Sequence, residues 1–258
     1  MLGNTYGWRA RLGIILPSIC LTEEYEYPKM VPEGVTVHFT RMIFENVTQE
    51  NYVRMLDDVP RSAKLLSHAR VHATAFACTS GSLFGGLGYD QKIIEIMKEH
   101  MNCPCTTTST AVVEALKACS IKKLGVGTPY PDWVNRLEQK FLEDSGFQIV
   151  HIRGILQDLK ELFGIDPENP SQELSFLTNA LTPQRVYEFA VSKINRSNCD
   201  GIFLSCMALP TLGIINMLEK DLGKPVISSS QATLWKLLKM VGIDTKVCME
   251  QFGSLFSG

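Results

Sequence analysis

The 258-residue chain has no continuous run of about 18 apolar residues, the length that a membrane-spanning helix needs. Its formal net charge is only -2 and it has no cluster of lysines or arginines, so it offers no electrostatic footprint for nucleic acid. The first nine residues lack a basic segment followed by an apolar one, the pattern of a secretion signal. We therefore expect a cytoplasmic protein that binds neither a membrane nor nucleic acid.

Nucleotide-binding and metal-binding motifs are also missing. The chain has no GxGxxG turn and no P-loop, so nothing in it predicts a bound nucleotide. Eight cysteines are present, but Cys103 and Cys105 are separated by one residue and no second pair stands at zinc-ligand spacing. Without a secretion signal, the cysteines are expected to be reduced thiols, most of them buried as small apolar residues. The sequence thus predicts no metal site.

The most informative stretch comprises residues 73–82. A run of small and apolar residues of strand length stops abruptly there at Cys78-Thr-Ser-Gly. Buried parallel strands have this composition, and ligands of open α/β sheets bind beyond the carboxyl ends of such strands. The stretch therefore predicts a strand that delivers a thiol and hydroxyl groups to a binding site.

The same pattern occurs again in the second half of the chain. Residues 201–211 form another apolar strand that ends in Cys206, followed by small residues. Two further motifs occur once in each half, in the same order. The first is a strand that begins with a basic residue, Leu and Gly and ends at a proline, at 11–18 and 123–130. The second is a proline followed by a short strand, a hydroxyl-rich N-cap and an amphipathic helix, at 104–116 and 225–237. The chain is therefore interpreted as an internal duplication.

Strands and helices alternate elsewhere as well. Periodicity predicts a helix over 83–101 that glycines interrupt, helices over 131–145 and 183–197, and a strand over 147–152. Such alternation indicates parallel sheets with helices on both faces.

We expect a fold of class α/β with two similar parallel-sheet domains, related by a pseudo-two-fold axis and with the active site in the cleft between them. The first domain is predicted at residues 1–117 and the second at 118–231, with a C-terminal helix in 232–258 that packs on the first. The polar loop 164–172 is interpreted either as a lid over the cleft or as a surface excursion.

Two thiols at duplicated strand ends can face opposite sides of one substrate carbon. One thiolate can remove a proton while the other thiol delivers one, or a thiolate can add to an activated alkene, allow rotation and be eliminated. Both routes require that the thiol pKa of about 8.5 be lowered by local donors or a helix N-terminus. We expect a helix after Cys78 and another after Cys206 to supply that partial positive charge.

Neutral donors near the cysteines suit a carboxylate or its enediolate. Thr79, Ser80 and the backbone amides that follow each cysteine can form an oxyanion hole. Tyr130 follows a strand-ending proline at the predicted cleft and is a candidate donor or acid. A two-domain protein that closes on a small carboxylate without chemistry would use the same groups.

Taken together, these segments resemble the aspartate/glutamate racemase superfamily, and within it the branch of maleate cis-trans isomerases and arylmalonate decarboxylases. The resemblance covers nearly the whole chain and is densest in Cys78-Thr-Ser, 104–112, 128–135, Leu204-Ser-Cys206 and 225–230. It implies two α/β domains, an interdomain site, no metal, no organic cofactor, and a small carboxylate or dicarboxylate substrate.

The resemblance also implies roles for individual residues. By position, Thr79, Ser80, Tyr130 and the amide of Met207 would hold a substrate carboxylate, and Cys206 would be the proton donor or base. Cys78 would be its catalytic partner, and Pro17 belongs to the expected substrate-binding set.

Two departures from the branch bear on the reaction. The decarboxylases carry glycine where Cys78 stands, so two thiols favour isomerase or racemase chemistry at a carbon adjacent to a carboxylate. Maleate isomerases carry an asparagine at the position of Cys20 and a second one near Asp158, and this chain has neither. Three interpretations stay open: an isomerase or racemase, a decarboxylase with Cys206 as proton donor, and a non-catalytic carboxylate-binding protein. Helices with apolar residues on both faces favour a homodimer.

Overall fold

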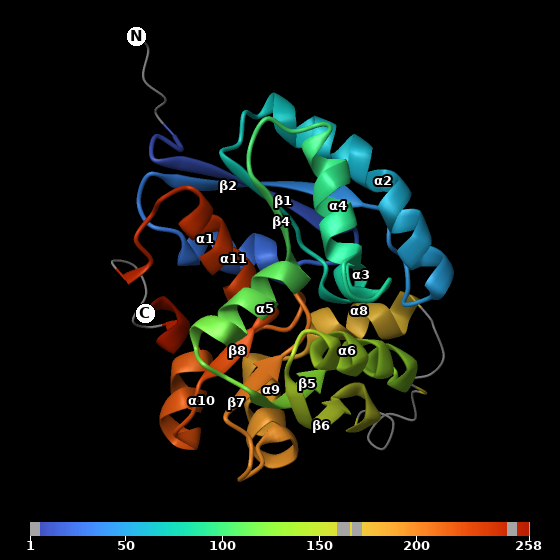
Figure 1. Cartoon of the computed structure of the whole chain (residues 1–258), viewed down its shortest axis with the longest axis vertical. Coiled ribbons are helices and arrows are strands. Elements are labelled where there is room, and N and C mark those ends of the chain that lie inside the picture. The colour runs from blue at the N-terminus through green and yellow to red at the C-terminus, as the bar shows by residue number, and fades with distance from the viewer. Residues whose placement is uncertain (1–5, 159–165, 167–171, 247–251, 258) are drawn as a thin grey trace.

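The protein contains two four-stranded parallel sheets, one in the upper and one in the lower half of Figure 1. The structure is a computed structural model that describes residues 6–158, 166, 172–246 and 252–257, with the backbone alone for 172–175. The first sheet has the order β2-β1-β3-β4 and the second the order β6-β5-β7-β8. The strands are β1 (Ala10–Pro17), β2 (Val35–Met42), β3 (Ala73–Phe76), β4 (Cys105–Thr107), β5 (Lys123–Thr128), β6 (Gln148–Gly154), β7 (Gly201–Leu204) and β8 (Val226–Ser228). The predicted fold class is confirmed.

The two sheets also repeat one another in register. In the first sheet Leu12 of β1 pairs with Ala73 of β3. In the second, Leu124 of β5 pairs with Gly201 of β7, and these are the residues that the duplicated motifs align with Leu12 and Ala73. The duplication inferred from the sequence is therefore present in the backbone pairing.

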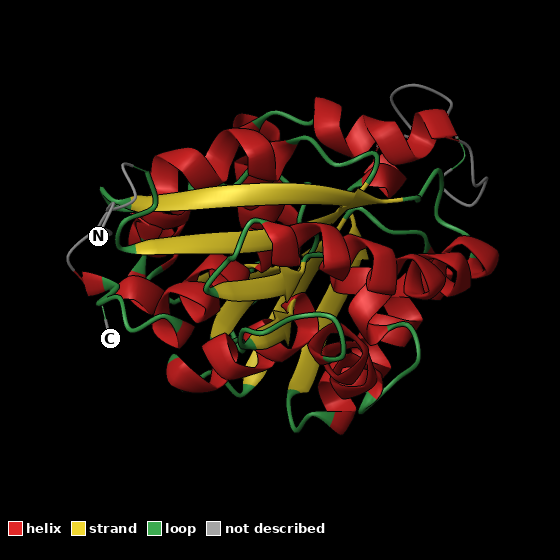
Figure 2. Ribbon diagram, turned by 90° about the horizontal axis from the view of Figure 1, so that it is seen from above, coloured by secondary structure: helices red, strands yellow, loops and turns green. Residues whose placement is uncertain are grey.

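Helices cover both sides of the strands, as Figure 2 shows. Those of the first half are α1 (Thr22–Met30), α2 (Gln49–His68), α3 (Thr79–Leu83), α4 (Tyr89–Lys98) and α5 (Thr108–Ala118). Those of the second half are α6 (Asp132–Asp144), α8 (Gln172–Ala180), α9 (Pro183–Phe189) with a π-helical turn at Ala190–Ile194, α10 (Ile215–Leu222), α11 (Ser229–Met240) and a short 3-10 turn (Ser254–Phe256). No helix among these described elements is both long and apolar enough to cross a bilayer.

The helix predicted over 83–101 is divided in the structure. The short α3 ends at Leu83, and α4 begins only at Tyr89. Gly86 and Gly88 lie between them with φ of +81° and +86°, a backbone conformation that a helix cannot contain. The glycine-rich segment is therefore a turn that separates α3 from α4, and after α4 the chain re-enters the sheet as β4.

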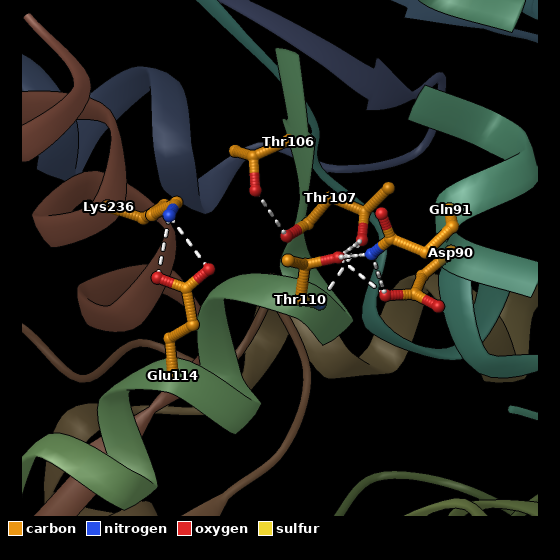
Figure 3. A network of polar contacts seen from close by, with 7 residues as sticks. All are labelled: Asp90, Gln91, Thr106, Thr107, Thr110, Glu114 and Lys236. Atoms are coloured by element: carbon orange, nitrogen blue, oxygen red, sulfur yellow. Dashed lines mark hydrogen bonds and ion pairs between the residues drawn. The ribbon is translucent and has the colours of Figure 1, made fainter. Parts of the chain in front are cut away.

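The predicted N-caps of α5 and α11 are confirmed. The Thr107 hydroxyl accepts a hydrogen bond from the amide of Thr110, and Ser228 forms a reciprocal capping box with Gln231. In Figure 3, the Thr110 hydroxyl also donates to Asp90 at 2.6 Å, which ties the start of α5 to α4. These contacts fix where each helix begins, directly beyond the edge of its sheet.

Helices α5 and α11 pack against each other at the centre of the molecule (Figure 1). Helix α5 also contacts β8 and α11 contacts β3 and β4, so each lies against a strand of the other half. Figure 3 shows the ion pair between Lys236 of α11 and Glu114 of α5, with 2.6 Å between Nζ and Oε2. One apolar cluster includes side chains of both sheets, such as Ile14 and Phe203. The halves therefore share a continuous core.

The domain boundaries after residues 117 and 231 stay predictions. Loop 164–172, considered above as a lid, lies almost entirely outside the described residues.

Candidate active site

The carboxyl ends of β1, β3, β5 and β7 meet at one cavity. All seven residues expected at the site line it: Pro17, Cys78, Thr79, Ser80, Tyr130, Cys206 and Met207. The cavity volume is about 60 Å³. At roughly 10–15 Å³ per water molecule, this is room for about four to six waters, so the cavity fits a small molecule.

Cys78 lies two residues beyond the end of β3 and is the N-cap residue of α3. Its sulfur accepts a hydrogen bond from the amide of Gly81 at 3.3 Å and lies 3.9 Å from the hydroxyl oxygen of Ser80. Burial raises the pKa of the Cys78 thiol to about 11, although both of these donors act to lower it.

Cys206 lies two residues beyond the end of β7, the position equivalent to that of Cys78. Its backbone φ is +139°, a conformation that residues other than glycine rarely adopt and that is found preferentially at functional sites. The expected helix after Cys206 is wrong: a turn follows, and α10 begins only at Ile215. The small residues after Cys206 therefore form this turn and not a helix N-terminus.

The expectation of lowered thiol pKa values is also wrong. Burial raises the pKa of Cys206 to about 12, and the amide of Ala208 and the hydroxyl of Tyr130 only partly oppose it. The free-energy cost of removing a thiolate from water exceeds the stabilisation that these neutral donors provide. Cys78 and Cys206 are therefore both protonated at neutral pH, which is the form that can donate a proton.

Ser229, at the start of α11, joins the two cysteine-bearing turns. Its hydroxyl oxygen accepts one hydrogen bond from the amide of Cys206 at 3.1 Å and another from the hydroxyl of Thr79 at 2.9 Å. Its side chain is fully buried. Because Thr79 follows Cys78 directly, this single hydroxyl fixes the thiol of one half relative to the thiol of the other.

A hydrogen-bond network holds Tyr130 at the cavity edge. The amide of Tyr130 donates to the hydroxyl of Thr128 at 3.1 Å, and the side-chain amide of Asn135 donates to the Tyr130 carbonyl at 3.3 Å. Burial and then the neighbouring Cys206 raise the pKa of Tyr130 well above its ordinary value. Its hydroxyl therefore stays protonated and can donate to a substrate carboxylate.

One wall of the cavity is apolar, and this wall was not predicted from the sequence. This wall includes the larger apolar side chains of Ile19, Phe44, Val47, Trp133 and Leu156. Phe44 and Val47 follow β2, a strand that was not predicted although residues 35–42 are rich in β-branched and aromatic residues. Among the described residues that line the cavity there is no lysine, arginine or histidine. Neutral donors would therefore hold any carboxylate bound there.

Cys20 and Asn179 are two further lining residues without an assigned role in the sequence analysis. The side-chain amide of Asn179 donates to the carbonyl of Ile19 at 2.9 Å, and its oxygen accepts from the amide of Leu21 at 3.1 Å. Asn179 thus holds the loop that carries Cys20, and both of its polar atoms are already engaged.

The structure shows no disulfide among the cysteines it describes, and these seven side chains are free thiols. Within the same residues, no group of three or more histidine, cysteine, aspartate or glutamate side chains could hold a metal ion.

Comparison with known proteins places this site in a family. A family model described as arylmalonate decarboxylase matches residues 12–256. The chain is 29% identical over 211 residues to the arylmalonate decarboxylase of Bordetella bronchiseptica, with 82% of each chain covered. It is 26% identical over 262 residues to the maleate isomerase of Geobacillus stearothermophilus, covering 96% of this chain and 97% of that protein.

Solved structures agree with the sequence comparisons. A cysteine-to-alanine variant of the maleate isomerase from Pseudomonas putida S16, crystallised with maleate, superposes with a TM-score of 0.83. The two chains are 26% identical, and the match covers 96% of this chain and 98% of that one. The predicted resemblance is confirmed: the chain belongs to the arylmalonate decarboxylase and maleate isomerase family of the aspartate/glutamate racemase superfamily.

Proposed function

We propose that the protein is a cofactor-independent isomerase or racemase that acts at a carbon adjacent to a carboxylate. The observation that carries this proposal is the placement of Cys78 and Cys206. They come from equivalent strand ends of the two halves, and both line one small cavity. The relatives named maleate isomerase support chemistry of this class.

In the racemase form of the reaction, Thr79, Ser80, Tyr130 and the Met207 amide hold the substrate carboxylate. The thiolate of one cysteine takes the proton from the α-carbon, and the electron pair of the C–H bond moves into the carboxylate to give an enediolate. The thiol of the other cysteine then protonates the opposite face of that carbon. The product has inverted configuration, and the two sulfurs have exchanged their protonation states.

Forming the first thiolate is the costly step. With a pKa of about 11, the Cys78 thiol is ionised in roughly one molecule in 10⁴ at pH 7. The proposal therefore requires the rate to depend on pH in the neutral range, because thiolate is the reacting species.

The apolar wall favours a substrate with one carboxylate and an apolar group on the reacting carbon. Phe44 and Trp133 in this wall offer no hydrogen-bond donor for a second carboxylate other than the indole N–H of Trp133. Cys20 stands where maleate isomerases have an asparagine, and the amide of Asn179 already binds the loop backbone. We therefore rank a 2-aryl or 2-alkyl carboxylate ahead of maleate.

A malonate-type decarboxylase is the second candidate, favoured by the same apolar wall and by the description of the matching family model. In that reaction the bond between the α-carbon and one carboxylate breaks, carbon dioxide leaves, and the electron pair stays in an enediolate. Cys206, protonated at neutral pH, then delivers its proton to the α-carbon, and Cys78 takes no part.

Proton NMR in deuterated buffer separates these functions. Maleate, an arylmalonate and one enantiomer of a 2-arylpropionate are each incubated with the protein. Deuterium entering the 2-arylpropionate with loss of optical purity supports the racemase, and fumarate from maleate supports the isomerase. Carbon dioxide loss from the arylmalonate, with one enantiomer formed and no racemisation, moves the assignment to the decarboxylase. No change in any sample would reject all of these substrates.

A further inference from the structure

Glu23 is a buried carboxyl group beside the cavity that the proposed reaction does not use. It lies in the first turn of α1, its exposed fraction is 0%, and neither carboxylate oxygen has a hydrogen-bond partner on another residue. An unpaired carboxylate in such a place is strongly disfavoured, so the group favours its neutral form. Burial accordingly raises the pKa of Glu23 to about 8.

The first turn of α1 lies directly against the turn that follows Cys206. The hydroxyl of Thr22 donates to the carbonyl of Ala208 at 2.8 Å. One turn further along, Glu26 accepts hydrogen bonds from the amides of Thr211 and Leu212, both at 2.9 Å. Ala208 lines the cavity, and Glu23 lies between Thr22 and Glu26 on α1, so these contacts hold the turn that carries Glu23 against a lining segment.

From this position a charge on Glu23 acts on every thiol that lines the cavity. Its negative charge would raise the pKa of Cys20, Cys78 and Cys206, which come from three different segments of the fold. None of the described lining residues carries a positive charge that could offset it. The proposed reaction already places two negative charges in the cavity, the substrate carboxylate and one thiolate. A neutral Glu23 adds no charge to these, whereas an ionised Glu23 would add a third.

We propose that Glu23 is a positioning residue whose neutral form allows the cavity to hold a substrate carboxylate and a catalytic thiolate. The proposal rests on the proposed function for its use of a carboxylate substrate. Its electrostatic part, the coupling of Glu23 to the thiols, holds for any reaction at this site.

Other charged groups around Glu23 do not replace it in this role. On α1, Glu24 is exposed and forms an ion pair with Arg41 of β2 at 2.7 Å. Arg41 also donates to the carbonyl of Cys20 at 2.9 Å. Its charge lowers the pKa of Glu23, but by less than the charge of Glu26 raises it, and the charge of Glu24 raises it by less still. Tyr27 is buried with a raised pKa and stays neutral. Glu23 is thus the carboxyl group on α1 whose charge acts on the cavity thiols.

Alkylation of the thiols tests this coupling without any substrate. Wild-type protein, Glu23→Gln and the control Glu24→Gln are treated with iodoacetamide between pH 6.5 and 9.5, and mass spectrometry follows the modification of Cys78 and Cys206. The charge of Glu23 is the smallest of the named effects on the pKa of Cys78 and Cys206, so we expect its removal to increase the thiolate by roughly two- to tenfold, which corresponds to at most about one pKa unit.

We expect wild type and Glu23→Gln to react alike below pH 7.5 and to diverge above pH 8, with the variant roughly two- to tenfold faster at pH 9. Glu24→Gln should follow wild type closely, because the charge of Glu24 has the smallest named effect on the pKa of Glu23 and is not among the named effects on the pKa of Cys78 or Cys206. The anionic reagent iodoacetate is repelled by an ionised Glu23. The ratio of the iodoacetate rate to the iodoacetamide rate should therefore fall above pH 8 in wild type and stay constant in Glu23→Gln.

Coincident profiles for wild type and Glu23→Gln up to pH 9.5 would overturn the proposal, as would an equal effect of Glu24→Gln. If Glu23→Gln does not fold by circular dichroism, Glu23→Met removes the same charge in an apolar form and is measured in its place. Because alkylation needs no turnover, a protein that converts none of the three NMR substrates can still pass this test. Failure of the proposed function and failure of the Glu23 proposal are therefore distinguishable.

Discussion

Replacing Glu138 by glutamine should stabilise the protein increasingly as the pH rises from 5 to 8. Glu138 lies on α6, its exposed fraction is 0%, and neither of its carboxylate oxygens has a hydrogen-bond partner. Burial raises its pKa from the ordinary 4.5 to about 8, and the nearby Ser205 hydroxyl only partly opposes this. The folded protein therefore keeps a proton that the unfolded chain releases above pH 4.5.

The sign and size of the effect follow from this difference in pKa. The contribution of Glu138 to stability is most favourable below pH 4.5, where both states are protonated, and it is lost as the pH rises toward the folded-state pKa of about 8. At about 1.36 kcal/mol per pKa unit, the difference between 4.5 and about 8 sets an upper limit of about 5 kcal/mol for that loss. Glutamine carries no charge at any of these pH values, so Glu138→Gln should not suffer this loss.

Urea unfolding followed by circular dichroism at pH 5, 6, 7 and 8 measures the free energy of unfolding directly. We expect the gain of Glu138→Gln over wild type to grow by several kcal/mol across this range. Glu143→Gln on the same helix is the matched control, because Glu143 is exposed, and its curve should parallel that of wild type. A difference between Glu138→Gln and wild type that does not change between pH 5 and 8 would refute the reasoning.

Three further predictions concern activity on whichever substrate the NMR assay identifies. Cys78→Ala and Cys206→Ala should each lower kcat by about 10²–10⁴-fold, the usual contribution of a positioned acid or base, whereas Cys199→Ala, a buried cysteine outside the cavity lining, should retain full activity. Full activity in either cavity variant would exclude the two-thiol mechanism, and decarboxylation retained by Cys78→Gly would support the second candidate. Between pH 6 and 8, kcat/KM should rise about tenfold per pH unit, because thiolate is the scarce reactant, and a flat profile would show that no thiolate is needed. Ser229→Ala should cost about 1–3 kcal/mol of stability and lower kcat, since it leaves the Cys206 amide and the Thr79 hydroxyl without their acceptor. Ser230→Ala is its matched control, because that buried hydroxyl has no partner to lose, and equal effects of the two variants would contradict this role for Ser229.

The strand-end thiols could be predicted from the sequence because the signals are local. An apolar run that stops at Cys78-Thr-Ser shows both the strand and its carboxyl end within ten residues. The second copy at Cys206 then indicated which thiols share a cleft. The register of the two sheets, in which Leu12 and Leu124 pair with equivalent residues, shows that the duplication inferred from the repeated motifs is present in the fold.

The environment of those thiols could not be predicted, because it depends on tertiary contacts. A helix was expected after Cys206, but the amides of Thr211 and Leu212 bind Glu26 of the other half, and α10 begins only at Ile215. The raised thiol pKa values come from burial, which a local motif does not reveal.

The remaining features were missed for a related reason. The apolar wall comes from loops such as the one with Phe44, whose position was unknown without β2. Glu23 and Glu138 look like ordinary polar positions of a helix, and only the packed structure shows that both are fully buried.

The most direct test of the two-thiol account uses one pure enantiomer of a 2-arylpropionate in deuterated buffer, with configuration and deuterium content followed together. The account predicts product of inverted configuration that carries deuterium at the α-carbon, because a proton is taken from one face and a solvent-derived deuteron is delivered to the other. Deuterium incorporated with full retention of configuration would contradict it, because a single group would then serve both steps on one face.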